Sequence, residues 1–454
     1  MKLLIALEQR FARGADEQFC AEGPANYGFW SRYLEVFDEL VVLARVSAEQ
    51  RACLEEARAD GPLVSFCALP DYRGPWQYLR NLPELRTTVR QAVVNCDAYI
   101  LRVPGLVGRL AWYEIRRLGK PYALEVVGDP WDALGPGTWP NVFRPIFRRA
   151  AARHLRAACQ GAIAIHYVTQ YALQRRYPPG KNAYTVGFSD ALMESVFAPP
   201  AALDERYRRI EELTGGGKEP GKRFRIGFIG SLSILYKAPD VFLRAASLCR
   251  SRGLNFEIVL VGDGRYAESI KALGRQLGLT DRTKFLGQLP FGKAIFDLLD
   301  SVDLFVMPSR AEGLPRALLE AMARGCPCIG SEVGGIPELL APVDIVPAGD
   351  AGALADKILD VARNPQLLKQ MALRNLERAR QFGPELLEEA HRSFLRIVRL
   401  HSEGAAADME GPAEVRIEEE GHRGRGVYRR ISAGGKDKDF SQHGRAGSLR
   451  SKYK

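Results

Sequence analysis

The sequence has no long hydrophobic run and only six histidines among its 454 residues. No stretch approaches the ~18 consecutive apolar residues that cross a bilayer. The first apolar run stops at Glu8, so it is too short for a signal-peptide core and predicts a buried first strand. We therefore expect a cytoplasmic protein whose only membrane contact would be peripheral, at the inner face of the cell membrane.

Cysteine pairs of the C-x-x-C kind are also missing, although the chain has eight cysteines. The spacing of Cys326 and Cys328 does not fit a zinc knuckle, and no histidine lies near them. We expect reduced structural thiols and no metal. The eight are Cys20, Cys53, Cys67, Cys96, Cys159, Cys249, Cys326 and Cys328.

No nucleic-acid-binding motif accompanies the formal net charge of +10. A basic surplus favours anionic partners, which include nucleic acid, membrane surfaces and phosphorylated small molecules. Without a motif we expect no specific nucleic-acid partner, and the charge does not choose between the other two.

Short apolar runs alternate with amphipathic helical segments in two series, residues 1–195 and 224–385. This alternation predicts two α/β domains, each with a parallel sheet covered on both faces. The expected strands are 2–7, 40–46, 64–69, 98–103, 122–128, 162–168 and 183–188, then 224–230, 256–262, 283–289, 303–309, 327–333 and 344–349.

Three further segments differ in composition from the two series. Residues 196–223 mix prolines, a glycine triplet and charges, which indicates an interdomain linker. Residues 386–401 predict a closing helix that packs back toward the first domain. Residues 402–454 have few apolar side chains and many glycines, so we expect a disordered tail.

The strongest motif follows the strand expected at 303–309. A loop carries Glu312 and Gly313, and a helix then begins with Pro315 in its first turn and ends at Gly325. The unpaired amides around Gly313 and Leu314, together with the helix dipole, suit a diphosphate.

Two carboxylates flank this helix start, Glu312 outside the helix and Glu320 within it. Pro315 and Glu320 lie roughly 7–8 Å apart along the axis at the helical rise. Carboxylates accept hydrogen bonds from vicinal hydroxyls, so the pair can hold both ends of a nucleotide sugar. Either glutamate alone would be read as an ordinary surface or helix-face residue.

Glu312 and Glu320, spaced in this way after a P-S-x-x-E-G strand end, resemble the paired-glutamate signature of family 4 retaining glycosyltransferases. The resemblance implies the GT-B arrangement of two Rossmann-like domains facing across a cleft. It further implies transfer of a sugar from a nucleotide-diphosphate sugar to a glycan or lipid-linked acceptor, in polysaccharide or glycoconjugate synthesis. Glu312 would contact the donor sugar and Glu320 the ribose, with no cofactor beyond the donor substrate.

Other elements of the second series resemble the donor site of that family. A glycine loop precedes a lysine for the diphosphate, and Ser231 stands where many members have arginine, for which Arg265, Arg310 or Arg316 could substitute. The implied donor-binding residues are Gly230, Ser231, Lys237, Gly262, Gly264, Leu286, Gly287, Glu312, Gly313, Leu314 and Glu320.

The first series is less informative. Asp129 follows a strand end and is a candidate catalytic residue on the acceptor side. The other two candidate catalytic residues are Glu312 and Lys237. Gly28 fits a phosphate-facing loop or a structural turn equally well. His166 is expected to be a hydrogen-bonded structural residue.

A basic amphipathic segment at 145–161 predicts contact with an anionic membrane surface through the first domain. The alternative is a surface helix whose apolar side packs on the sheet. The basic band would be Arg148, Arg149, Arg153 and Arg156, and the apolar side Ile146, Phe147, Leu155 and Ala158.

Two other functions remain open at this point. A sugar epimerase or hydrolase could use the same double-Rossmann scaffold, although those enzymes lack the paired-glutamate loop. A catalytically inactive nucleotide-sugar-binding subunit of a polysaccharide-assembly complex is the alternative from a different class, and slow hydrolysis of the donor would distinguish it from an active transferase.

Overall fold

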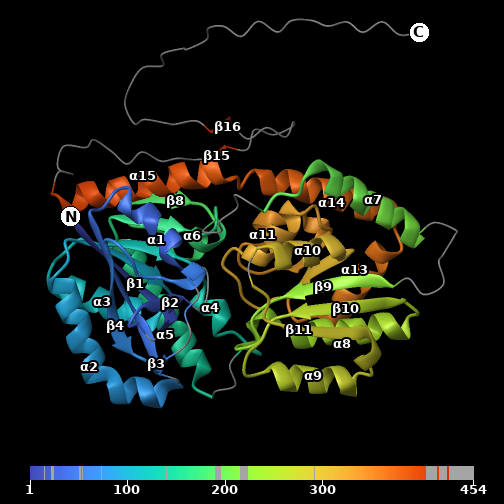
Figure 1. Cartoon of the computed structure of the whole chain (residues 1–454), viewed down its shortest axis with the longest axis horizontal. Helices are drawn as coiled ribbons and strands as arrows, with labels where there is room; N and C mark the ends of the chain where they lie inside the picture. The colour runs from blue at the N-terminus through green and yellow to red at the C-terminus, as the bar shows by residue number, and fades with distance from the viewer. Residues whose placement is uncertain are drawn as a thin grey trace, which may run out of the picture.

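The computed structural model describes residues 1–404 except 15, 22–24, 51–52, 54, 73, 139–141, 190–195, 215–222 and 291, and also describes 417–418 and 427–428. It contains two α/β domains that lie side by side, the first mostly blue to green and the second mostly green to orange (Figure 1). The two-domain α/β architecture expected from the sequence is therefore confirmed.

The first domain is built on one eight-stranded sheet. Its strands are β1 (Lys2–Arg13), β2 (Phe19–Ala21), β3 (Glu39–Gln50), β4 (Val64–Pro70), β5 (Ala98–Val103), β6 (Ala123–Val126), β7 (Ala164–Tyr167) and β8 (Tyr184–Gly187). Seven run parallel in the order β4-β3-β1-β5-β6-β7-β8, and β2 pairs with β1 antiparallel. β6 and β7 are buried along their whole length because helices cover both faces of a parallel sheet.

Helices cover this sheet on both sides (Figure 1). They are α1 (Tyr27–Leu34), α2 (Gly74–Val94), α3 (Leu106–Arg117), α4 (Pro130–Ala133), α5 (Arg144–Gly161) and α6 (Ala172–Arg176).

The second domain contains a six-stranded sheet, all parallel. Its strands are β9 (Phe224–Ile229), β10 (Phe256–Val261), β11 (Thr283–Gly287), β12 (Leu304–Met307), β13 (Cys328–Ser331) and β14 (Ile345–Val346), in the order β11-β10-β9-β12-β13-β14. Its helices are α7 (Pro200–Thr214), α8 (Pro239–Ser251), α9 (Ala267–Gln276), α10 (Lys293–Ser301), α11 (Arg316–Ala323), α12 (Ile336–Leu339), α13 (Ala351–Ala362) and α14 (Pro365–Arg380). β9 lies at the centre of the order, so the chain crosses from one half of the sheet to the other between β11 and β12.

Helix α7 corrects the expectation of a linker over 196–223. It packs on the second domain through Arg206, which is 3% exposed. The guanidinium of Arg206 donates hydrogen bonds to the carbonyls of Val302 (2.6 Å) and Leu299 (2.8 Å). The charged composition that indicated a linker therefore serves a packed interface, because arginine can satisfy carbonyls at the end of a helix.

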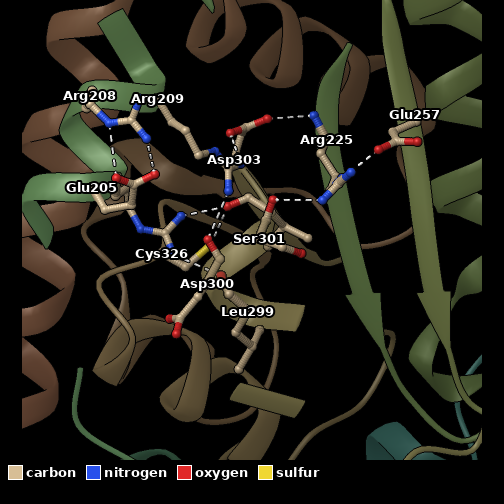
Figure 2. A network of polar contacts seen from close by, with 12 residues as sticks. Glu205, Arg208, Arg209, Arg225, Glu257, Leu299, Asp300, Ser301, Asp303 and Cys326 are labelled. Carbon is tan, nitrogen blue, oxygen red and sulfur yellow. Dashed lines mark hydrogen bonds and ion pairs between the residues drawn. The ribbon is translucent and has the colours of Figure 1, made fainter. Parts of the chain in front are cut away.

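A chain of ion pairs continues from α7 into the sheet (Figure 2). Arg209 points toward Asp303, whose second oxygen accepts the backbone N–H of Arg225 at 2.7 Å. The side chain of Arg225 in turn reaches Glu257 on β10 at 2.5 Å. These contacts fix α7 to the amino-terminal edge of β9, β10 and β12, opposite the edge where the site lies.

The last helix, α15 (Pro384–Ser402), returns to the first domain and lies along it in Figure 1. Phe394, Leu395 and Val398 are fully buried in the core formed on that side of the first sheet. Arg392 forms an ion pair with Glu35 at 3.0 Å. Helix α15 therefore runs from the end of the second domain onto the first.

The expectation that all cysteines are reduced is wrong for one pair. Cys20 and Cys53 form a disulfide, while the other six cysteines are free. The short antiparallel strand β2, which the sequence did not predict, brings Cys20 to the segment that follows β3.

The predicted disorder of 402–454 lies almost wholly outside the described residues. Residues 402–404 complete the end of α15, and β15 (Ile417–Glu418) pairs antiparallel with β16 (Val427–Tyr428). Within the described ranges, no helix is both long enough and apolar enough to cross a membrane.

Candidate donor-binding site

A buried ion pair lies where β12 ends. The ammonium of Lys237 lies 2.8 and 2.9 Å from the two carboxylate oxygens of Glu312, and Ser309 donates its hydroxyl to the same carboxylate at 2.6 Å. The side chains of Lys237 and Glu312 are 14% and 5% exposed. Two residues 75 positions apart thus meet at the carboxyl end of the second sheet.

Burial and the neighbouring carboxylate act on Lys237 in opposite directions. Burial lowers the pKa of Lys237, and the negative charge of Glu312 raises it, with a net rise above the ordinary value. Lys237 is therefore a cation at neutral pH. A short 3-10 turn ending at Lys237 delivers it, and Ala238 follows in the left-handed region with φ of 54°.

Helix α11 begins beside this pair. Pro315 is its N-cap residue, with no side chain capping it, so the amides of its first two residues have no intrahelical acceptor. At the other end the N–H of Gly325 bonds to Met322 and that of Cys326 to Ala321, which closes the helix in a Schellman motif. The helix lies where the motif predicts it, except that Pro315 is the N-cap and not a residue of the first turn. Its amino end lies at the carboxyl edge of the sheet, near the junction of the domains.

Glu320 lies on α11 and is 5% exposed. Burial raises its pKa, while Arg316, whose guanidinium lies 3.7 Å away, acts in the opposite direction. Among the described residues, its carboxylate makes one ion pair, the 3.7 Å contact with Arg316, and it has acceptor capacity for a ligand hydroxyl.

The glycines of the predicted donor site are places where two backbones nearly touch. A Cβ added to Gly262, whose φ is 144°, would lie 1.9 Å from the carbonyl oxygen of Gly230. One added to Gly264, with φ of 148°, would lie 2.2 Å from the backbone nitrogen of Ser233. Glycine is thus required at both positions, and the loops after β9 and β10 are held together at the sheet edge.

The remaining donor-side residues line the same edge. Ser231 accepts a hydrogen bond from the backbone N–H of Ser233 at 3.2 Å. Gly287 has a φ of 66° and its carbonyl accepts the N–H of Gly262 at 2.8 Å, while Leu286 is 44% exposed. The structure thus brings the loops after β9, β10, β11 and β12 to one edge.

Of the arginines that could replace the missing cation, Arg310 is already engaged. It forms a bidentate contact with Asp240 at 2.6 and 2.8 Å. Arg316 lies against Glu320, and Arg265 is exposed with its guanidinium over the ring of Tyr266. Arg265, whose side chain is exposed, is therefore better able than Arg310 to turn toward a phosphate.

On the first domain, Asp129 is 6% exposed and serves as the N-cap of α4. Its carboxylate accepts the backbone N–H of Trp131 at 2.8 Å and the hydroxyl of Tyr177 at 2.5 Å, and it pairs with Arg176. Its acceptor positions are thus occupied, which favours a role in holding α4 and α6 together over direct chemistry.

Two other first-domain candidates have clear surroundings. His166 is buried, with Nε2 2.9 Å from the carbonyl of Phe188, so the prediction of a hydrogen-bonded structural histidine is confirmed. Gly28 lies in the first turn of α1, which Asn26 caps, and lines a surface cavity of about 370 Å³.

The carboxyl ends of the two sheets meet at this site. A Cβ on Gly313 would lie 2.4 Å from the carbonyl oxygen of Val127, the residue that follows β6. Glu338 on α12, which the sequence analysis did not single out, accepts backbone hydrogen bonds from residues 170–172 of the first domain. Nothing in the sequence spacing links these segments, so only the fold reveals the contact.

In the part of the chain that the structure describes, no group of three or more histidine, cysteine, aspartate or glutamate side chains could hold a metal ion. The polar groups at the site include Lys237, Glu312, Glu320, Ser309, Arg316 and backbone amides, and such cations and amide donors suit a phosphorylated sugar.

Comparison with known proteins agrees with this geometry. Residues 223–364 match the family model described as Glycosyl transferases group 1. Protein CapJ of Staphylococcus aureus is 25% identical over 329 residues, which cover 71% of this chain and 78% of CapJ. N-acetyl-alpha-D-glucosaminyl L-malate synthase of Bacillus anthracis is 37% identical over 186 residues, so the match spans 39% of this chain and 46% of the synthase.

Among solved structures, Anabaena HepE in complex with UDP-glucose superposes with a TM-score of 0.57 at 19% identity. The superposition covers 87% of this chain and 99% of HepE. These findings define the fold as GT-B. Residues 223–364 thus match the group 1 glycosyl transferases, and the resemblance to family 4 glycosyltransferases is confirmed.

Proposed function

We propose that this protein transfers a sugar from a nucleotide-diphosphate sugar to a glycan or lipid-linked acceptor with retention of anomeric configuration. The observation that carries the proposal is the buried pair of Lys237 and Glu312 beside the first turn of α11. Support for a nucleotide donor comes from HepE, a protein of the same fold that has been solved with UDP-glucose. Support for glycoconjugate synthesis comes from the partial match to the malate-coupling synthase.

The reaction proceeds with few protein groups. The bond between the anomeric carbon and the diphosphate oxygen breaks, and its electron pair leaves on the diphosphate. The acceptor hydroxyl oxygen bonds to the anomeric carbon on the same face, and its proton passes to the departing diphosphate. Lys237 and the first-turn amides of α11 stabilise the negative charge that develops on the diphosphate, and electrostatic stabilisation of this kind usually lowers the barrier more than any other effect.

Glu312 has two roles in this account. Without donor it neutralises Lys237 in a buried setting where an isolated cation would be costly. When donor binds, the diphosphate takes over the lysine and Glu312 becomes free to accept a hydrogen bond from a sugar hydroxyl. Glu320, deeper along α11, holds the ribose.

The test is release of free nucleotide from a panel of nucleotide sugars, because an active transferase slowly hydrolyses its donor in water. We expect one donor of the panel to be consumed. No release from any donor, together with retained nucleotide binding, would contradict the proposal and favour an inactive binding subunit.

We further propose that the first domain contacts an anionic membrane at the start of α5. Val142 and Ile146 are 87% and 63% exposed, and Arg149 and Arg153 are exposed beside them. Exposed apolar side chains flanked by arginines suit binding to a surface of anionic lipid headgroups. Such contact would place the protein at the inner face of the cell membrane, near lipid-linked acceptors.

Two arginines of the predicted basic band contact the first domain itself. Arg148 donates to the carbonyl of Trp131 at 2.5 Å, and Arg156 donates to that of Arg176 at 3.1 Å. Leu155 is buried in the core together with Ala158. The proposed contact is therefore limited to the first turns of α5 rather than to its whole length.

A further inference from the structure

Glu338 joins the second domain to the first through its side chain. It is 2% exposed. Its carboxylate accepts three successive backbone N–H groups, from Gln170 at 2.6 Å, Tyr171 at 3.1 Å and Ala172 at 2.7 Å. These residues follow β7 and begin α6 in the first domain. Hydrogen bonds to a charged acceptor are roughly twice as strong as neutral ones, so this contact is a strong one at the junction.

The backbone around Glu338 is tied to the loop that carries the donor-site glutamate. Gly335 donates its N–H to the carbonyl of Gly313 at 2.7 Å. Gly334, with φ of 51°, lies so close to the carbonyl oxygen of Glu312 that a Cβ would be 2.2 Å away. Arg378 on α14 donates to the carbonyl of Glu338 at 2.7 Å. The segment 334–338 is therefore fixed to the donor loop at one end and to the second domain's helices at the other.

On the first domain, the contact continues to the acceptor-side candidate. Helix α6 starts at the residues that Glu338 binds and ends at Arg176, which pairs with Asp129. Tyr177, directly after α6, donates its hydroxyl to the same aspartate. A series of contacts thus runs from Gly313, next to Glu312, through Glu338 and α6 to Asp129, across the domain junction.

We propose that Glu338 is a positioning residue that holds the donor loop against the acceptor-side domain. The proposal rests on the transferase function proposed above and adds a residue to it. Glu338 does not touch the substrate. It fixes where Glu312 and the sugar lie relative to the acceptor, and small displacements of reacting groups have large effects on rate.

Loss of the carboxylate should separate two properties of the protein. The nucleotide is held by the second domain alone, so its affinity should change by less than about twofold. Transfer needs the two domains in the correct relative position, so kcat should fall about ten- to a hundredfold. This is the range for losing charge-assisted hydrogen bonds. A merely structural residue would instead lower affinity, stability and turnover together.

The experiment compares Glu338→Gln and Glu338→Ala with the matched control Glu332→Gln, whose side chain is exposed in the loop that precedes α12. Three quantities are measured on the full chain: the Kd for UDP, kcat for nucleotide release from the donor with water in place of the acceptor, and the radius of gyration by X-ray scattering. We expect a lower kcat, an unchanged Kd and a larger radius in both Glu338 variants, with the control like the wild type.

An unchanged kcat, or a loss of nucleotide affinity and melting temperature that parallels the loss of kcat, would overturn the proposal. The radius of gyration separates this result from failure of the proposed function. If the wild type releases no nucleotide from any donor, the transferase function fails, while an unchanged radius in the variants would still refute the role of Glu338.

Discussion

At the scale of single residues, the two glutamates of the donor site differ in what holds them. Glu312 has a lysine and a serine hydroxyl within 3 Å, whereas Glu320 has one arginine at 3.7 Å. Glu312 is thus held in a fixed geometry before the donor arrives. Glu320 has unused acceptor capacity, which fits a group that waits for the ribose.

Substitution of the two residues should therefore have different effects. On the proposed assignment, Glu320→Ala removes a ribose contact and should raise the Kd for the nucleotide about ten- to a hundredfold. Glu312→Gln should chiefly lower kcat by a similar factor, because the sugar is misplaced while the nucleotide remains bound. Calorimetry and donor-turnover assays measure the two effects, with Glu268→Gln on the exposed face of α9 as control. Wild-type behaviour of both variants would show that the site is elsewhere.

Residues of this site could be predicted from the sequence only where the spacing is local. Glu312 and Glu320 could be predicted because a strand end, a loop and a helix start follow one another within twelve residues. The ion pair between Lys237 and Glu312 could not be predicted, since the sequence motifs assign both residues to contacts with the donor. Glu338 gave no signal because its partners are more than 160 positions away.

At the scale of elements, α7 provides a direct test of its packing. Arg206 is buried and donates to carbonyls of α10 and of the residue that follows it, whereas Arg208 on the same helix has a side chain that is 61% exposed. Arg206→Met should lower the free energy of unfolding by about 2–4 kcal/mol, because buried carbonyls lose their charged donor.

Arg208→Met is the matched control and should leave the free energy of unfolding nearly unchanged, because exposed ion pairs contribute little. Urea unfolding of both variants measures the difference. Equal effects would mean that α7 behaves as the linker that its composition indicated.

Helix α15 contains a buried histidine that makes its docking sensitive to acid. Burial, and then the electrostatic effects of Arg32, His166 and Arg102, lower the pKa of His391 well below its ordinary value. A group with a lowered pKa in the fold contributes stability above its unfolded pKa of about 6.5, and that stability is lost as pH falls through the folded pKa. Acid should therefore weaken the contact between α15 and the first domain.

The measurement is the melting temperature between pH 7 and pH 4 for the wild type, for His391→Phe, and for His401→Gln on the same helix. The His391→Phe variant should lose less stability on acidification than the wild type, since no buried imidazole then takes up a proton. Parallel curves for the wild type and His391→Phe would contradict this account.

The elements themselves could largely be predicted because buried parallel strands are read as continuous apolar runs. All thirteen expected strands correspond to observed ones, β1 and β3 to β14. The two elements that the sequence did not predict have physical causes. Strand β2 has only three residues, too few for a pattern, and α7 has a mostly polar surface whose arginines are satisfied by carbonyls of the second domain.

At the scale of the whole molecule, the start of α5 makes the proposed membrane contact testable. Each basic residue near an anionic surface contributes about 1 kcal/mol, and exposed apolar side chains add to it. Anionic vesicles should sediment the protein at low salt and release it at high salt. Changing Arg149 and Arg153 to glutamine should weaken this binding, while Arg148→Gln should have less effect because Arg148 donates to Trp131. Equal sedimentation with neutral vesicles, or none with either kind, would refute the contact.

The relative placement of the two domains was expected only through the family resemblance, because no local pattern encodes it. It arises from contacts between distant segments: Gly313 against Val127, Glu338 against the start of α6, and α15 against the first sheet. The residues in these contacts are buried or partly buried, as core residues of either domain are, so their apolar or polar character alone did not show which domain they face.

The central claim is that the edge with Lys237 and Glu312 cleaves a nucleotide-diphosphate sugar. The most direct measurement is nucleotide release from a panel of nucleotide sugars by the wild type, Lys237→Met and Glu312→Gln. The account predicts release from one donor by the wild type, and at least about a hundredfold less by Lys237→Met, the loss seen when one charge-stabilising group is removed from such a site. Equal release by the wild type and Lys237→Met, or no release from any donor by the wild type, would contradict it.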